Sequence, residues 1–122
     1  MAWKFTPGTS LSEQIAERIK MDIVNGVYPP GSPFPTVRQL AFEASVNPNT
    51  MQKALTALED DGLLITLSTQ GRIVTSDGNL IKKAGEYRVK KEINKMILHA
   101  REMSLSFDEF IILLQKGWNE NE

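Results

Sequence analysis

The sequence predicts a mainly α-helical protein with one small β-hairpin, arranged as a winged helix-turn-helix domain followed by a short two-helix tail. Two helical patterns lie between residues 36 and 60, with only Ser45 and Val46 between them. Two apolar, β-branched runs then flank a polar segment, as in a hairpin. Residues 79–104 contain no Pro and repeat apolar side chains at helical spacing. We therefore expect a winged domain over residues 1–77 and a helical tail over residues 78–122.

Composition excludes several kinds of site. The 122 residues suffice for one domain of ordinary core size plus a small appendage. The chain has no Cys and a single His, His99, so it offers no thiolate nucleophile and no Cys or His pair for zinc. It also has no Gly-rich phosphate loop and no Gly-x-Ser-x-Gly motif. We therefore expect no metal, no cofactor and no enzymatic activity.

No segment of the sequence resembles an export signal or a membrane span. The N-terminus lacks a basic segment followed by an apolar run, and no apolar run approaches the length needed to cross a bilayer. We expect a soluble, cytoplasmic protein that does not contact a membrane.

The first helix is expected to begin at Ser10 or Ser12 and to end before Gly26. Either serine can accept a hydrogen bond from a free N–H at a helix start, and Gly suits the position after a helix end. The apolar side chains of this helix fall on one stripe, which is formed by Leu11, Ile15, Ile19 and Ile23.

The segments on either side of this helix carry other patterns. Trp3 and Phe5 alternate with a polar residue, which predicts a short strand. Residues 27–34 contain three Pro and one Gly, so they are too broken for an element and predict a rigid connection.

Two helices joined by a tight turn are expected next. Thr36, with Gln39 three residues later, makes a capping box for the first of them. Asn47 can cap the second, and Pro48 suits its first position because a missing N–H costs nothing there. The second helix is expected to end at Gly62. Since only two residues separate the helices, they must meet at a sharp angle, as in a helix-turn-helix.

The second of these helices carries hydrogen-bonding side chains opposite its apolar stripe. Asn49, Gln52, Lys53 and Thr56 offer two amides, a cation and a hydroxyl, which are groups that can contact base edges. A merely solvated surface is the alternative. Arg38 is the only basic residue on the preceding helix, and we interpret it as a phosphate or base contact. A surface salt bridge is the alternative for this residue.

The predicted hairpin follows at residues 63–67 and 73–75. The segment between them contains Gly71, where the backbone can come close to a phosphate, and Arg72, a residue type that binds narrow minor grooves. A solvated turn arginine is the alternative. Three helices followed by such a hairpin form the winged helix-turn-helix arrangement.

These residues together resemble the GntR family of bacterial transcription regulators, over about two-thirds of the chain. Residues 25–31 are similar to the family's Gly-x-Leu-x-Pro-Gly connection, and residues 34–41 to its Leu-Pro-Ser-x-Arg-x-Leu-Ala helix. The match continues from Val46 to Leu64. The Asn-Pro-Asn-Thr run at residues 47–50 and the short tail are similar to the YtrA-type branch, whose members are implied to be small dimeric repressors.

The resemblance implies which residues contact DNA. Arg38 would hold the DNA backbone or a guanine, the start of the second helix would read the bases, and Gln70 with Gly71 would form the wing tip. The wing departs most from the family, because Arg72 stands where the family favours Thr. The predicted DNA-binding set is Thr36, Arg38, Asn47, Pro48, Asn49, Thr50, Gln52, Lys53, Gln70, Gly71 and Arg72.

The apolar pattern of the tail predicts two amphipathic helices, which cannot fully bury each other's apolar surfaces. The second begins at a capping box of Ser106 and Glu109. A tail of roughly 40 residues is too small to bury its own apolar surface. We expect a second copy to cover it, with packing on the chain's own winged domain as the alternative. The predicted dimerisation residues are Val89, Ile93, Met96, Ile97, Ala100, Phe107, Phe110, Ile111, Leu114 and Trp118.

The charge distribution is unusual for a protein expected to bind DNA. Residues 1–78 carry six cations and eight acids, whereas nucleic-acid-binding domains are usually basic. Residues 79–101 carry seven cations and two acids, and Lys82 and Lys83 either form a solvated face or reach phosphates. We expect binding to depend on dimerisation and specific contacts, with a shallow dependence on salt.

The sequence therefore predicts a homodimeric repressor that binds a pseudo-palindromic operator in double-stranded DNA. The alternative is a winged-helix module that binds other proteins and no DNA. A small-molecule effector at the tail interface is compatible with the first function but is not indicated, because the chain has no sizeable effector domain.

Overall fold

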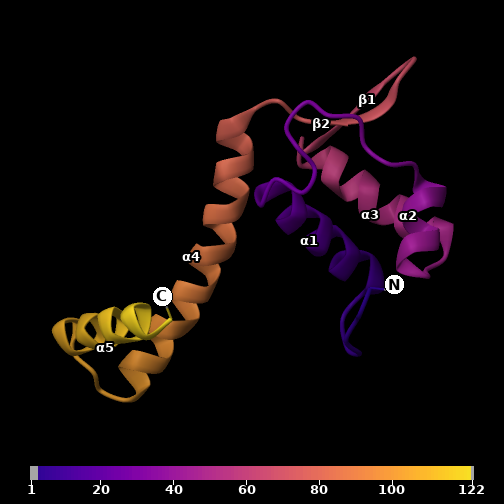
Figure 1. The fold of residues 1–122 in the computed structure, drawn as a ribbon. Helices are drawn as coiled ribbons and strands as arrows, with labels where there is room; N and C mark the ends of the chain where they lie inside the picture. Colours follow the sequence, from indigo (N-terminus) through magenta and orange to yellow (C-terminus); the bar gives the residue numbers. More distant parts are fainter. Residues whose placement is uncertain (1–2, 122) are drawn as a thin grey trace. The chain divides into compact units, whose positions relative to one another are not determined.

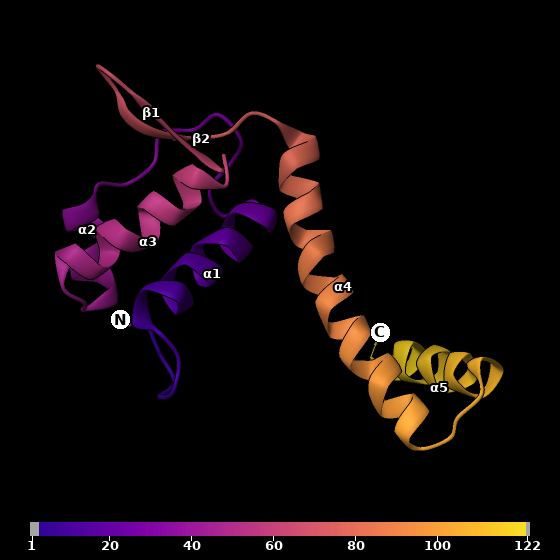
Figure 2. The same cartoon turned by 180° about the vertical axis from the view of Figure 1, so that it is seen from behind.

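A computed structural model describes residues 3–121 (Figures 1 and 2). These residues form five helices and one two-stranded antiparallel sheet, which confirms the predicted fold class. The chain divides into two compact units, the first ending at Gly85 and the second beginning at Glu86. In chain order the elements are α1 (Leu11–Val24), α2 (Val37–Ala44), α3 (Pro48–Asp60), β1 (Leu64–Leu67), β2 (Gly71–Val74), α4 (Gly78–Glu102) and α5 (Phe107–Glu120).

α1 lies beside α3 in both views and supplies one side of the core of the first unit (Figures 1 and 2). Ser10 caps α1 by accepting a backbone N–H of its first turn. Ile15, Ile19 and Ile23 follow at intervals of four and are at most 1% exposed. Leu11 is 37% exposed, so the buried stripe begins one turn later than the sequence predicted.

The predicted strand at Trp3 and Phe5 does not form. Residues 3–6 have no regular secondary structure, and the sheet of the described residues consists of β1 and β2 alone. Trp3 is nevertheless buried in the core, and the guanidinium of Arg18 on α1 lies 4.3 Å from the centre of its ring. The apolar alternation at the N-terminus therefore reflects packing on helices.

The helix-turn-helix forms as predicted. Thr36 and Gln39 make both hydrogen bonds of the capping box, at 3.2 and 2.8 Å. α2 ends at Ala44, and the next residue, Ser45, has a left-handed φ of 58° that turns the chain toward α3. Asn47 caps α3 and Pro48 is its first residue. The buried side chains of the two helices are Leu40, Ala41, Ala44, Met51, Ala54, Leu55 and Leu58.

β1 and β2 form the wing, with Leu67 paired to Gly71 at its outer end. The turn is therefore limited to residues 68–70. The predicted boundary, which put Gly71 and Arg72 in the turn, is wrong. Gly71 has φ 69°, and a glycine of this conformation directly after a three-residue turn allows the second strand to start at once.

The base of the wing is held by the connection between α1 and α2. The N–H of Phe34 donates to the carbonyl of Arg72, and the N–H of Val74 donates to the carbonyl of Ser32, both at 2.9 Å. These bonds satisfy one edge of β2, so only the outer part of the hairpin projects from the unit.

The tail forms the two predicted helices. The first turns of α4 belong to the first unit, where Ile81 joins the core. α4 is followed by Ser104 in a left-handed conformation, and the capping box of Ser106 and Glu109 starts α5. Within residues 3–121 no helix has the length and apolar character that crossing a bilayer requires.

Candidate nucleic-acid interface

The first turn of α3 is exposed and only partly capped. Oδ1 of Asn47 accepts the N–H of Asn49 at 2.8 Å, which satisfies one of the free donors at the helix start. Asn47, Pro48 and Asn49 are exposed and Thr50 is half-buried. Pro48 has no N–H and the N–H of Met51 donates to the carbonyl of Asn47, so the helix dipole is what favours a negatively charged ligand such as a phosphate here. This end of α3 can therefore present two amides to a polyanion.

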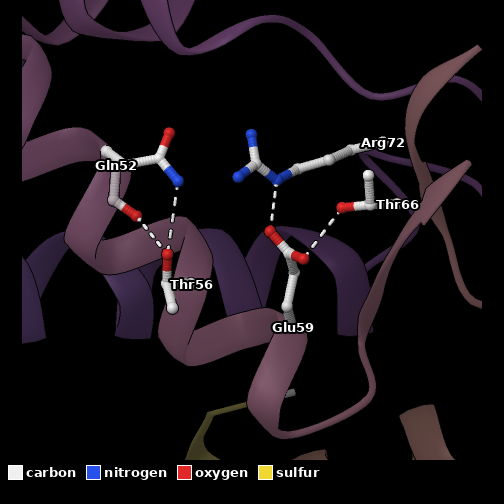
Figure 3. A network of polar contacts seen from close by, with 5 residues as sticks. All are labelled: Gln52, Thr56, Glu59, Thr66 and Arg72. Atoms are coloured by element: carbon white, nitrogen blue, oxygen red, sulfur yellow. Dashed lines mark hydrogen bonds and ion pairs between the residues drawn. The ribbon is translucent and has the colours of Figure 1, made fainter. Parts of the chain in front are cut away.

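Gln52 and Thr56 extend the exposed face of α3 (Figure 3). Nε2 of Gln52 donates to the hydroxyl of Thr56 at 3.3 Å, and that hydroxyl donates to the carbonyl of Gln52 at 2.9 Å. The pair holds the amide in place and leaves Oε1 of Gln52 free of both bonds. A side chain held in this way loses less conformational entropy when it binds a ligand.

Lys53 lies on another flank of α3. It lines a cleft together with Glu13, Glu17 and Lys20 of α1. The helical spacing had grouped Lys53 with Gln52, but the structure separates the two because α1 packs along one side of α3 only. Asp61 also lines this cleft, and its three carboxylates reduce the positive potential that Lys53 offers to a phosphate.

Arg38 lies on α2 and lines a cleft with Val46 and Pro48, beside the first turn of α3. The cleft also contains Phe42, whose side chain is 89% exposed. The sequence analysis missed Phe42, and its only signal was an aromatic residue outside the apolar stripe of α2. Thr36, at the start of α2, is exposed and uses its hydroxyl in the capping box.

The wing contributes Gln70, Gly71 and Arg72, which lie in different surroundings. Gln70 is in the turn and is exposed, and Gly71 starts β2. Arg72 lies in β2, and its Nε donates to Oε1 of Glu59 on α3 at 2.6 Å. Only 18% of the Arg72 side chain is exposed. Arg72 is therefore not a solvated turn residue, while its contact with DNA stays a prediction.

Glu59 binds both strands of the wing (Figure 3). Its Oε2 accepts the hydroxyl of Thr66 on β1 at 2.8 Å, and Thr66 is the cross-strand partner of Arg72. Partial burial raises the pKa of Glu59, but the hydrogen bonds from Arg72 and Thr66 outweigh burial and hold this pKa below its ordinary value. The sequence analysis had counted Glu59 only among the eight acids of residues 1–78.

Ion pairs place cations beside two of the acids of the first unit, although they leave its net charge unchanged. Asp61, near Glu59, lies 3.8 Å from Nζ of Lys20, and Asp22 lies 4.0 Å from Nε of Arg18. The acids at the far end of α3 are thus partly neutralised, and the first turn of α3 carries none. No group of residues within 3–121 has the carboxylates and imidazoles to hold a metal ion.

Comparisons with known proteins agree with this geometry. The family model for bacterial regulatory proteins of the gntR family matches residues 11–74, which run from α1 to β2. The chain is 31% identical over 93 residues to the HTH-type transcriptional repressor YtrA of Bacillus subtilis, covering 75% of this chain and 72% of YtrA.

Two solved structures extend the comparison. A GntR family transcriptional regulator from Listeria monocytogenes superposes with a TM-score of 0.84 at 27% identity, covering 92% of this chain and 98% of that one. The DNA-binding domain of AraR in complex with operator ORX1 superposes with a TM-score of 0.53 at 25% identity, covering 62% of this chain and 95% of that one.

Proposed function

Since this chain belongs to the GntR family of bacterial regulatory proteins and is a transcriptional regulator of its YtrA-type branch, not an enzyme, we propose that it is a homodimeric repressor. It binds a pseudo-palindromic operator in the cytoplasm. Residues 1–77 bind DNA and residues 78–122 dimerise. The repressor assignment is supported by the similarity to the transcriptional repressor YtrA, and the operator by the similarity to AraR, whose DNA-binding domain was solved in complex with an operator.

The exposed face at the start of α3 is the observation that carries DNA reading. Asn49, Gln52 and Thr56 present amides and a hydroxyl on a helix whose opposite side is fully buried. Amides can bond the N6 and N7 edge of adenine in the major groove, and Arg38 beside them suits the DNA backbone. This division of labour is typical of helix-turn-helix proteins, in which the second helix reads bases.

The apolar surface of the second unit supports dimerisation. Phe107 and Trp118 are 75% and 71% exposed in the single chain, and Val89 is 57% exposed. A groove between α4 and α5 is lined mainly by apolar side chains, among them Ile93, Met96, Ile97, Ala100, Phe110, Ile111 and Leu114. A unit of this size cannot bury such a surface alone, and a second copy covers it with the symmetry that two operator half-sites require.

Mobility shifts with genomic DNA of the source organism, followed by protection mapping, test the DNA-binding proposal. We expect a protected site with two similar half-sites about one helical turn apart, or a multiple of it. Protection of a single asymmetric half-site contradicts the two-fold operator. Absence of a shifted fragment contradicts DNA binding.

Sedimentation of Met96→Glu tests the dimer, because it places a charge in the apolar groove. We expect the wild type to sediment as a dimer at micromolar concentration and Met96→Glu as a monomer. Asn94→Glu is the matched control, since it adds the same charge at an exposed polar position of α4. A monomeric wild type, or a variant Met96→Glu that stays dimeric, contradicts the proposal.

One observation favours the alternative function, a module that binds proteins. Phe42 projects into solvent beside the cleft of Arg38, and exposed aromatic side chains are enriched at protein interfaces. Phe42→Ala separates the two functions. If the chain is a DNA-binding regulator, we expect Phe42→Ala to bind the operator almost as well as the wild type. If instead the wild type binds no DNA and Phe42→Ala loses a protein partner that the wild type binds, the alternative function is supported.

A further inference from the structure

The carboxylate of Glu59 on α3 forms hydrogen bonds with both strands of the wing. Glu59 lies on α3 one turn beyond Thr56, and its two oxygens bind Arg72 of β2 and Thr66 of β1. The side chains of Gln52, Thr56 and Glu59 lie on the same side of α3 as the Arg72 guanidinium (Figure 3). The contact between helix and wing is therefore continuous with the exposed face that reads DNA in the proposed function.

The contact between Glu59 and Arg72 is well suited to hold the wing at one angle to α3; we call it the helix–wing joint. The side chains of Glu59 and Arg72 are only 28% and 18% exposed, and the backbone carbonyl of Arg72 is occupied by the N–H of Phe34. Arg72 is thus held at both its backbone and its side chain. A charged bond between partly buried groups is stronger than one between solvated groups and restricts the angle between its elements.

We propose that Arg72 is a positioning residue, which acts on DNA binding through Glu59 by fixing the wing tip relative to α3, and not as a DNA contact. Residues 68–70 are the part of the wing left to reach DNA, and their position depends on the angle at which the hairpin leaves α3. This inference rests on the proposed DNA-binding function. According to this inference, Arg72 raises DNA affinity because it fixes the position of the wing tip, and not because its positive charge neutralises a DNA phosphate.

Glu59→Gln separates geometry from charge. Removal of an acid near DNA strengthens binding on electrostatic grounds, whereas loss of the joint weakens it. We expect operator affinity to fall about threefold to tenfold, which corresponds to about 0.7–1.4 kcal/mol. Asp60→Asn is the matched control, because it removes the same charge one residue away at an exposed position, and we expect it to leave affinity unchanged or slightly higher. Operator binding by Glu59→Gln that equals or exceeds that of the wild type overturns the inference.

Arg72→Met gives a second, independent readout in the dependence of binding on salt. A lost phosphate contact makes the plot of log affinity against log salt shallower by about 0.9. We expect affinity to fall with this slope unchanged, and with no additional loss in the double variant with Glu59→Gln. A shallower slope identifies Arg72 as a phosphate contact and overturns the inference.

Two further measurements keep the test decisive if a charge variant fails to fold. Thr66→Val removes a hydrogen bond to Glu59 without a change in charge, and Thr66→Ser retains the hydroxyl. We expect weaker binding and faster amide exchange in residues 64–74 for the valine substitution only. Equal binding by both variants overturns the inference. If the wild type binds no DNA, both the proposed function and this inference fail. If the wild type binds its operator and the variants bind it equally well, only the positioning role of Arg72 is refuted.

Discussion

Gln52 and Thr56 hold each other one helical turn apart on α3, with Nε2 of Gln52 3.3 Å from the Thr56 hydroxyl. The hydroxyl in turn bonds the backbone carbonyl of Gln52. The amide of Gln52 is therefore oriented before any ligand arrives, and its Oε1 is directed away from both bonds.

We expect Gln52→Ala to weaken binding to the cognate operator by about 1–3 kcal/mol and to relax the preference at one base position. The reason is the loss of a direct base contact by an oriented amide. Binding to a panel of operators with single base changes measures both effects. Thr56→Val is the companion variant, which frees the amide and is expected to weaken binding less. An unchanged affinity and footprint for Gln52→Ala removes this residue from the interface.

We expect Arg38→Ala to weaken binding by a similar factor for all DNA sequences. Arg38 lies on α2, and in helix-turn-helix proteins the first helix of the motif crosses the DNA backbone. The plot of log affinity against log salt becomes shallower by about 0.9. Lys116→Ala removes an exposed cation from α5 and is the control, with no expected change. A loss confined to operators with guanine at one position shows instead that Arg38 reads a base.

Asn47 has two roles that one pair of variants separates. Asn47→Ala removes the cap of α3, and we expect the free energy of unfolding to fall by about 0.5–2 kcal/mol. Asn47→Ser keeps a cap and restores stability, but we expect operator binding to stay weaker because Nδ2 is lost. Urea unfolding and mobility shifts on the same samples give the two quantities. A serine variant that binds like the wild type limits Asn47 to capping.

The pKa of Glu59 predicts a pH dependence of stability. Because this pKa is lower in the folded chain than in the unfolded chain, the unfolded chain binds more protons in the interval between the two values. The stabilisation by Glu59 is fully present above the ordinary glutamate pKa of 4.5 and is lost as the pH falls through the lower folded value. We expect Glu59→Gln to be less stable than the wild type at pH 7, with the difference shrinking in acid. A difference that is constant with pH contradicts the ionised pair.

The tail and the helix-turn-helix show what a sequence without structure can predict. The capping boxes Thr36–Gln39 and Ser106–Glu109 both form, and α3 begins at Pro48 behind the Asn47 cap. Each of these signals involves residues within three positions of one another. Their geometry is set by the helix itself, so it does not depend on the packing of distant segments.

The contacts around the wing needed the tertiary structure. Glu59 and Arg72 are 13 residues apart, and whether they meet depends on the angle at which the hairpin leaves α3. Trp3 was wrongly predicted to lie in a strand because alternation records burial on one side and does not reveal whether a sheet or a helix covers that side.

The sequence by itself determined where α2, α3 and α5 start, which side of α3 is apolar, and which polar groups α3 carries. Only the tertiary structure decided that Lys53 lines a cleft with residues of α1 while Gln52 stays on the open face, and that Arg72 has a protein partner. The physical reason is the distance along the chain over which the deciding interactions act. Helix caps and helical spacing act over one turn, whereas the surroundings of a side chain depend on elements brought beside it by the folding of the whole unit.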